Sequence, residues 1–119
     1  MGQILDMRIV KKICKVEYFE EEIFPPNLLV EVTGEVPSGG FYKVKLVRVT
    51  NETPPEDGIQ DYILFAVPPP DLVSQIITPV KAKNRLVSYA KEAPWIKGLR
   101  VHGVDNCVVV MLSFKLDPK

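Results

Sequence analysis

Apolar and polar side chains alternate with a period of two along much of this 119-residue chain. In one clear segment Leu28, Val30 and Val32 alternate with Glu31 and Thr33. Such alternation is typical of a β-strand with one buried face. The chain also contains 11 prolines, and proline interrupts helices because it lacks a backbone donor. We therefore predict a domain built almost entirely of strands.

Turns rich in proline, glycine and asparagine divide the chain into seven or eight short strands. These strands are expected over residues 9–16, 28–36, 41–50, 59–67, 72–82, 85–89, 95–101 and 107–116. Residues 62–67 of the fourth strand and residues 107–116 are apolar on both faces, so we place these two strands centrally. The first strand carries several lysines and the fifth carries Pro79, which predicts that both lie at sheet edges. Gly34 suggests a bulge or a bend, and a slip in the alternation predicts a bulge near Leu46-Val47.

The expected fold is an all-β, two-sheet antiparallel β-sandwich with at most one short helix, formed by residues 1–119 as a single domain. A chain of this length can bury a sufficient core without a disulfide or a metal. Strand number and proline-rich turns resemble the immunoglobulin and fibronectin type III sandwiches in architecture. The immunoglobulin sequence pattern is absent, because Trp95 comes far too late after Cys14 and Asp105 replaces the tyrosine expected two residues before Cys107. The resemblance therefore implies a fold and no function.

The segment from Arg85 to Ala93 fits two structures. Leu86, Tyr89, Ala90 and Ala93 follow helical spacing, with Asn84 as a candidate cap and Pro94 as the stop. The run Leu86 to Tyr89 also fits a short strand, and we favour the strand because a nine-residue helix is marginal alone.

Charge and hydropathy exclude several classes of protein. The 15 basic and 15 acidic side chains balance, which argues against binding to nucleic acid. No apolar run is long enough to cross a membrane, so we predict no membrane insertion. The first residues contain no signal peptide, which predicts a cytoplasmic protein, or a secreted one if Met1-Gly2 was added in cloning.

Cys14 and Cys107 are expected to be buried free thiols without a chemical role, because cysteine packs as a small apolar residue and no secretion signal is present. His102 is the single histidine, and it stands near Asp105 and Cys107 beside a predicted turn. These three residues are too few for a structural zinc site, and no nucleophile motif surrounds any serine. We therefore expect no cofactor, metal site or catalytic residues, and a hydrolase is the third and least favoured function.

Two small-ligand functions form the alternative prediction. Trp95 and Tyr89 would form a stacking platform for carbohydrate if both were exposed side by side. Glu56, Asp57 and Asp61 would supply oxygen ligands to calcium if a backbone carbonyl joined them.

The leading prediction is a non-enzymatic binding or structural module that contacts other protein through its sheet faces and loops. Trp95, Tyr89 and His102 are the candidate residues of the binding surface. We also expect a weak homodimer around Leu86 to Tyr89, because that strand has few of the charges that protect a sheet edge. Val108, Val110, Leu112 and Phe114 are expected to face the core.

Overall fold

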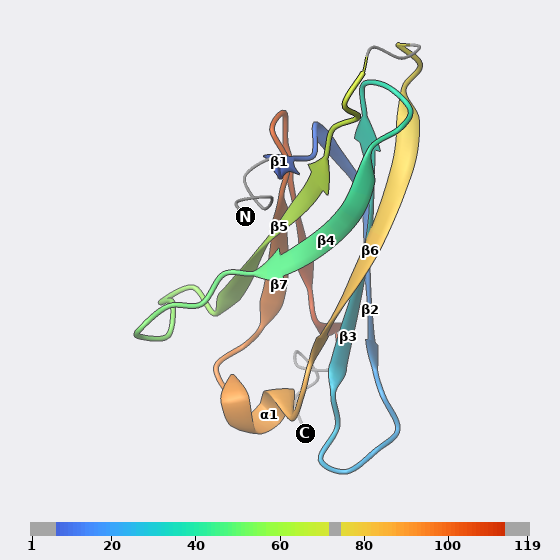
Figure 1. Ribbon diagram of the computed structural model, residues 1–119. Helices are drawn as coiled ribbons and strands as arrows, with labels where there is room; N and C mark the ends of the chain where they lie inside the picture. The colour runs from blue at the N-terminus through green and yellow to red at the C-terminus, as the bar shows by residue number, and fades with distance from the viewer. Residues whose placement is uncertain (1–6, 72–74, 114–119) are drawn as a thin grey trace.

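A computed structural model describes residues 7–71 and 75–113 of the chain. Its strands form two packed sheets, with one short helix between strands of different sheets (Figure 1). In chain order the elements are β1 (Arg8–Ile9), β2 (Lys12–Glu20), β3 (Leu28–Val36), β4 (Tyr42–Arg48), β5 (Ile59–Val67), β6 (Thr78–Leu86), α1 (Tyr89–Glu92), β7 (Gly98–His102) and β8 (Cys107–Met111). The prediction of an all-β sandwich is confirmed.

The small sheet has three strands in the order β2-β3-β6, and all its pairs are antiparallel. β3 lies in the middle because its inner face is wholly apolar apart from Gly34. The edge positions of β2 and β6 confirm the expectation drawn from their lysines and Pro79. The bulge expected at Gly34 is not in β3, which is continuous there. It lies in the neighbouring β2, after Ile13, opposite Gly34.

The large sheet is centred on β5, which pairs with β4 on one side and with β7 and β1 on the other. β8 pairs with β7 and ends the sheet, so the prediction that residues 107–116 form a central strand is wrong in that respect. Alternation alone cannot separate a central strand from an edge strand packed on both faces. Residues 114–116 of that prediction, with Phe114, lie outside the described residues.

One pair departs from the expected antiparallel arrangement, because β5 and β7 run parallel. After β5 the chain enters the small sheet as β6, turns through α1 and returns to the large sheet in the original direction. A parallel pair needs such a crossover connection rather than a hairpin. In the segment Arg85 to Ala93 the favoured prediction of a separate short strand is wrong, because β6 ends at Leu86 and a single helical turn follows over Tyr89–Glu92.

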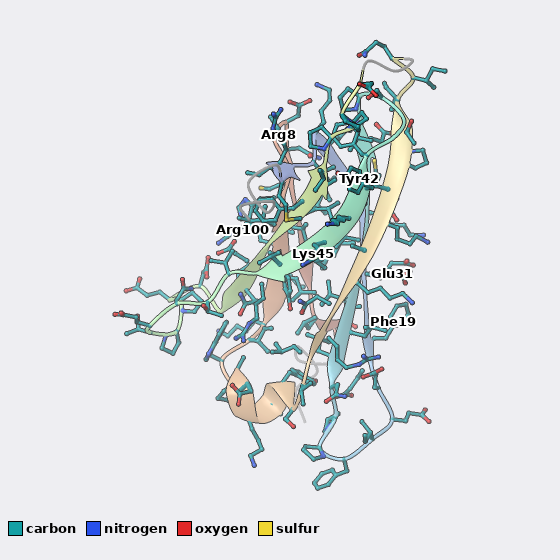
Figure 2. All side chains as sticks on the ribbon, in the orientation of Figure 1. Arg8, Phe19, Glu31, Tyr42, Lys45 and Arg100 are labelled. Carbon is teal, nitrogen blue, oxygen red and sulfur yellow. The ribbon has the colours of Figure 1, made fainter. Side chains whose placement is uncertain are left out.

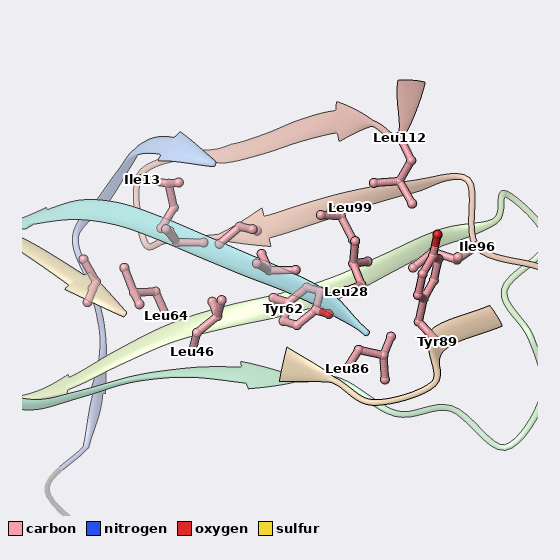
Figure 3. Close-up of a cluster of buried hydrophobic side chains, with 14 of the residues drawn as sticks. Ile13, Leu28, Leu46, Tyr62, Leu64, Leu86, Tyr89, Ile96, Leu99 and Leu112 are labelled. Atoms are coloured by element: carbon pink, nitrogen blue, oxygen red, sulfur yellow. The ribbon is translucent and has the colours of Figure 1, made fainter. Parts of the chain in front are cut away.

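The core lies between the sheets and follows the predicted alternation in the best-defined strands (Figure 3). Val30 and Val32 of β3 face Leu64 of β5 and Leu99 of β7, and all four are fully buried. Val108 and Val110 pack against this core, and Leu112 is buried, as predicted. The largest wholly buried side chains are Tyr62, Ile13, Leu28, Leu64, Ile96, Leu99 and Leu112.

Side chains also join the two sheets along both seams of the sandwich. Between β2 and β8, the Asn106 amide accepts a hydrogen bond from the Ile13 N–H at 2.9 Å and donates to the Ile13 carbonyl at 3.0 Å. On the same seam the Tyr18 hydroxyl donates to the Met111 carbonyl at 3.0 Å. Between β4 and β6, the Asn84 amide donates to the Leu46 carbonyl at 3.2 Å.

Candidate functional site

The outer face of the large sheet points away from the core and is mostly apolar. Because Tyr62, Leu64 and Ala66 of β5 are buried, the residues between them point outward. The outer face consists of Ile9, Lys45, Val47, Asp61, Ile63, Phe65, Arg100, His102, Cys107, Val109 and Met111. Ile9, Val47, Val109 and Met111 are between 39% and 49% exposed.

The outer face of the small sheet has a different character. Its outward residues include Lys15, Glu17, Glu31, Lys81, Lys83 and Arg85, with the apolar Phe19 and Leu29 paired on the same face. Glu31 forms an ion pair with Lys81, with 3.7 Å between Oε2 and Nζ, as expected for a solvated face. In Figure 2, Lys45 and Arg100 belong to the outer face of the large sheet. Glu31 and Phe19 belong to the outer face of the small sheet, on the other side of the sandwich. The two sides of one sandwich are therefore chemically distinct.

A fixed group of ion pairs lies in the middle of the apolar outer face. The parallel register places Arg100 of β7 opposite Asp61 of β5. Arg100 Nε donates to Asp61 Oδ1 at 2.6 Å and Nη2 donates to Oδ2 at 3.2 Å, which gives a two-point contact. Asp57 Oδ2 accepts from Arg100 Nη1 at 3.3 Å, and its other oxygen accepts from the Ile59 N–H.

His102 joins this group through Nε2, which lies 2.8 Å from Asp61 Oδ1. Hydrogen bonds from Arg100 hold the pKa of Asp61 below its ordinary value, burial opposes this shift, and His102 adds to it. Asp61 in turn raises the pKa of Arg100. Asp61 is therefore a carboxylate whose charge is balanced by neighbours in the same face.

This geometry bears on the calcium prediction. Asp57 and Asp61 do converge, but on the Arg100 guanidinium rather than on an open space. Glu56 is exposed in the preceding loop. Among residues 7–71 and 75–113 no group of three or more acidic, histidine or cysteine side chains is placed to hold a metal ion.

His102 and Cys107 are directly opposite each other in β7 and β8, so they do share a face. The acidic partner of His102 is Asp61, whereas Asp105 forms an ion pair with Lys11 at 3.0 Å. Within the described chain no hydrogen bond joins Cys107 to His102. The three side chains therefore lie together without forming an assembled thiol nucleophile.

The prediction that Trp95, Tyr89 and His102 form one binding surface is wrong. Tyr89 is 2% exposed, and its hydroxyl donates to Glu20 Oε2 at 2.7 Å. Burial and the nearby Glu20 carboxylate raise its pKa. Its place at the start of α1 puts the ring in the core, so it cannot form an exposed platform with Trp95.

Trp95 is half-buried and lines a cleft of about 330 Å³ beside the loop that follows β4. Gln60 is buried under this cleft, where its amide donates to the Val49 carbonyl at 2.6 Å. Gln60 Oε1 accepts from Arg48 Nε at 2.9 Å and so fixes the guanidinium. The main polar lining residues are Arg48, Asn51, Glu52, Gln60 and Glu92.

Sequence reasoning missed Arg100 and the outward residues of β8. The alternation did separate Val109 and Met111 from the core-facing residues of the same strand. The alternation could not show that the side of β8 with Val109 and Met111 is exposed to solvent, because that exposure depends on the order of strands in the sheet.

A search of protein-family models, curated proteins and solved structures finds no significant match for this chain.

Proposed function

We propose that this domain is a protein-binding module that uses the outer face of the large sheet to contact a partner protein. The observation that carries the proposal is the contrast between the two outer faces of one sandwich. Ordinary solvation explains the charged face of the small sheet. It does not explain several exposed apolar side chains gathered on the other face.

The composition of this face supports a protein partner. The centres of protein interfaces are poor in lysine and glutamate and rich in methionine, arginine and aromatic residues. Here the outward set contains Met111, Arg100 and the half-buried Phe65, and Lys45 is its single lysine. The expected partner therefore offers a flat, largely apolar surface.

The rigidity of the face also favours binding. The outward side chains stand on paired strands, and Asp61 is held by Arg100 and His102 at its centre. Little side-chain freedom remains to be lost on association, which lowers the entropic cost of binding. The likeness to immunoglobulin-type sandwiches stays a prediction, and a binding role for exposed sheet faces and loops is compatible with it.

Site-specific photo-crosslinking tests the proposal. A photoreactive amino acid placed at Val109 should capture a discrete protein, and one placed at exposed Lys83 on the small sheet should not. The captured protein is then purified. The substitution Val109→Lys should weaken its binding at least about tenfold, whereas Lys83→Glu should leave it unchanged. Equal capture from both positions, or unchanged binding by Val109→Lys, would contradict the proposal.

A second candidate function is carbohydrate binding, and one observation favours it. Trp95 lines a cleft together with amide, carboxylate and guanidinium groups, the residue types that stack on and hydrogen-bond to sugars. Trp95 is the single tryptophan, so its fluorescence reports on the cleft directly. Titration with neutral and acidic oligosaccharides should change this emission in the wild type and not in Glu52→Ala. Unchanged emission with all of them would exclude this function.

A further inference from the structure

The hairpin loop between β2 and β3 carries the most exposed large apolar side chain among the described residues. Phe24 is 93% exposed, and its neighbour Ile23 is 58% exposed. Burial of an aromatic side chain is strongly favourable, so a phenylalanine standing in water at a loop tip is an available contact. We call residues 21–27 the tip.

Hydrogen bonds brace the base of the tip. Arg85 donates from Nε and Nη2 to the two oxygens of Glu21 at 2.8 and 2.9 Å. Asn27 donates to Glu21 Oε1 at 3.0 Å and accepts from the Ser88 N–H at 3.0 Å. The Glu21 N–H also donates to the Asn27 carbonyl. Phe24 is therefore presented on a preorganised support, which lowers the entropic cost of docking.

The opposite end of the molecule has an apolar pocket of about 210 Å³. Its apolar lining consists of Ile9, Val10, Val36, Pro37, Phe41 and Val104. The exposed cations Arg8 and Lys11 line it too. The tip precedes Leu28 and the pocket includes Val36, so β3 separates them by its full length, roughly 30 Å. The tip loop and β1 lie at opposite ends of the sandwich (Figure 1).

We propose that Phe24 of one copy of this chain seats in the Arg8–Lys11 pocket of a second copy. The pocket is large enough, because an apolar cavity of about 150 Å³ accepts benzene. The charges also match, because Glu22 is exposed on the acidic tip and Arg8 and Lys11 flank the pocket. Asp105 balances part of the Lys11 charge, which leaves Arg8 as the main cation facing Glu22.

Such a contact joins two different surfaces and does not close on itself. The tip and the pocket lie at opposite ends of a molecule that measures 54 × 30 × 28 Å. Repetition of the contact therefore builds a linear chain of copies rather than a symmetric dimer. It shares only Ile9 with the outer face of the large sheet and uses no residue of the Trp95 cleft. The substitutions at Phe24 and Val104 lie outside both sites, so their outcome is independent of both proposed functions.

The structure also bears on the homodimer expected at Leu86 to Tyr89. Leu86 and Tyr89 are buried, and the Ser88 N–H is bound to Asn27. This segment is therefore not the open strand edge that the prediction assumed, and the head-to-tail contact is a different mode of association.

Two complementary variants test the contact by sedimentation velocity. Phe24→Ser removes the tip side chain and keeps the pocket, whereas Val104→Glu places a negative charge at the pocket and keeps the tip. Both residues are exposed, so circular dichroism should show an unchanged fold. The wild type should form a concentration-dependent series of species, and each variant alone should stay monomeric. An equal mixture should form a heterodimer and nothing larger.

Three results would overturn the proposal: Phe24→Ser associating as the wild type does, a mixture without heterodimer, or a mixture that forms longer chains. A charge exchange gives an independent check. Glu22→Lys should weaken self-association several-fold, Arg8→Glu in the same chain should restore it, and Glu52→Lys should have no effect. If wild type but not Phe24→Ser instead cosediments with phosphatidylcholine vesicles and stays monomeric, the tip is a membrane contact and the proposal fails.

Discussion

The hydroxyl of Tyr62 is the one buried side-chain polar atom in the described part of the chain with no hydrogen-bond partner. Its ring is fully buried, and burial raises its pKa to about 12. An unpaired buried hydroxyl costs free energy because it gives up its bonds to water.

Tyr62→Phe should therefore raise the free energy of unfolding, by about 1 kcal/mol. Urea denaturation followed by circular dichroism measures this change. Tyr89→Phe is the matched control, because it removes a hydroxyl that does bond to Glu20, and it should lower the stability by about 1 kcal/mol. A loss of stability in Tyr62→Phe would show that this hydroxyl has a favourable contact.

Asp61 should make the stability depend on acid pH. Its pKa is lower in the folded protein than its ordinary value of 3.8, mainly because Arg100 donates to it. Its contribution is therefore complete above the ordinary value and is lost as the pH falls through the lower, folded value. Asp61→Asn should cost about 1 kcal/mol at pH 7, since the pair is partly exposed, and progressively less as the pH falls below 3.8. A pH-independent difference in urea unfolding would contradict this explanation.

The residue types at the site were visible in the sequence, but their contacts were not. Asp57 and Asp61 were identified, with Glu56, as candidate calcium ligands, whereas their partner Arg100 was not identified. Arg100 reaches them only because β5 and β7 pair in parallel after a crossover. Nothing in local alternation encodes that pairing, because it joins strands separated by β6 and α1.

Among the elements, β2 and β3 approach each other closely at Gly34. A Cβ atom at this position would lie 2.7 Å from the Lys12 carbonyl oxygen and 2.9 Å from Leu64 Cδ2. Glycine is therefore required where the bulge after Ile13 brings β2 against the sheet.

Gly34→Ala should destabilise the domain by about 2–3 kcal/mol, because the backbone must shift to relieve these contacts. Thermal and urea unfolding give the value. Gly39→Ala is a suitable comparison, since its nearest neighbour atom is 3.9 Å away, and it should change the stability by less than about 1 kcal/mol. Similar losses in both variants would point to glycine flexibility in general rather than to the contact.

Strands with strong alternation between clear turns were predictable to the residue. β3 and β5 have the bounds expected from the sequence, Leu28–Val36 and Ile59–Val67. Bulges were harder to place, because a slip in the pattern shows that one exists and leaves its position open. The irregularity in β4 lies between Tyr42 and Lys45 rather than near Leu46-Val47. In β2 the bulge leaves Cys14 exposed, and Cys107 on the outer side of β8 is exposed as well, so the expectation that both thiols are buried is wrong.

In the whole molecule, the side chains of Asn106 and Tyr18 both join the β2–β8 seam by hydrogen bonds. Asn106 makes two hydrogen bonds to the backbone of Ile13, which is 1% exposed. Asn106→Ala should cost about 3 kcal/mol, because both backbone groups lose their partner in a buried position. The rate of hydrogen exchange at the Ile13 amide should rise by at least the factor that corresponds to this loss of free energy. Asn51→Ala, in an exposed loop, should change neither quantity, and an unchanged Ile13 amide in Asn106→Ala would contradict this role of the seam.

The layered architecture followed from the sequence, whereas the order of strands within each layer did not. Alternation and turns predict how many faces must be buried, and two packed sheets satisfy that requirement. Sheet order depends on which strands meet after long connections. The sheet order therefore determines features that the sequence did not predict, such as the edge position of β8 and the exposure of its outer side.

The seam also has a consequence for how the domain is made. Asn106 and Ile13 are separated by 93 positions, and Tyr18 meets Met111 across the same separation. During synthesis, β2 is made long before the residues that it contacts across the seam. Contacts so distant in sequence make folding slow. During that interval the lysines and the bulge of β2 protect a nascent chain from aggregation through its open edge.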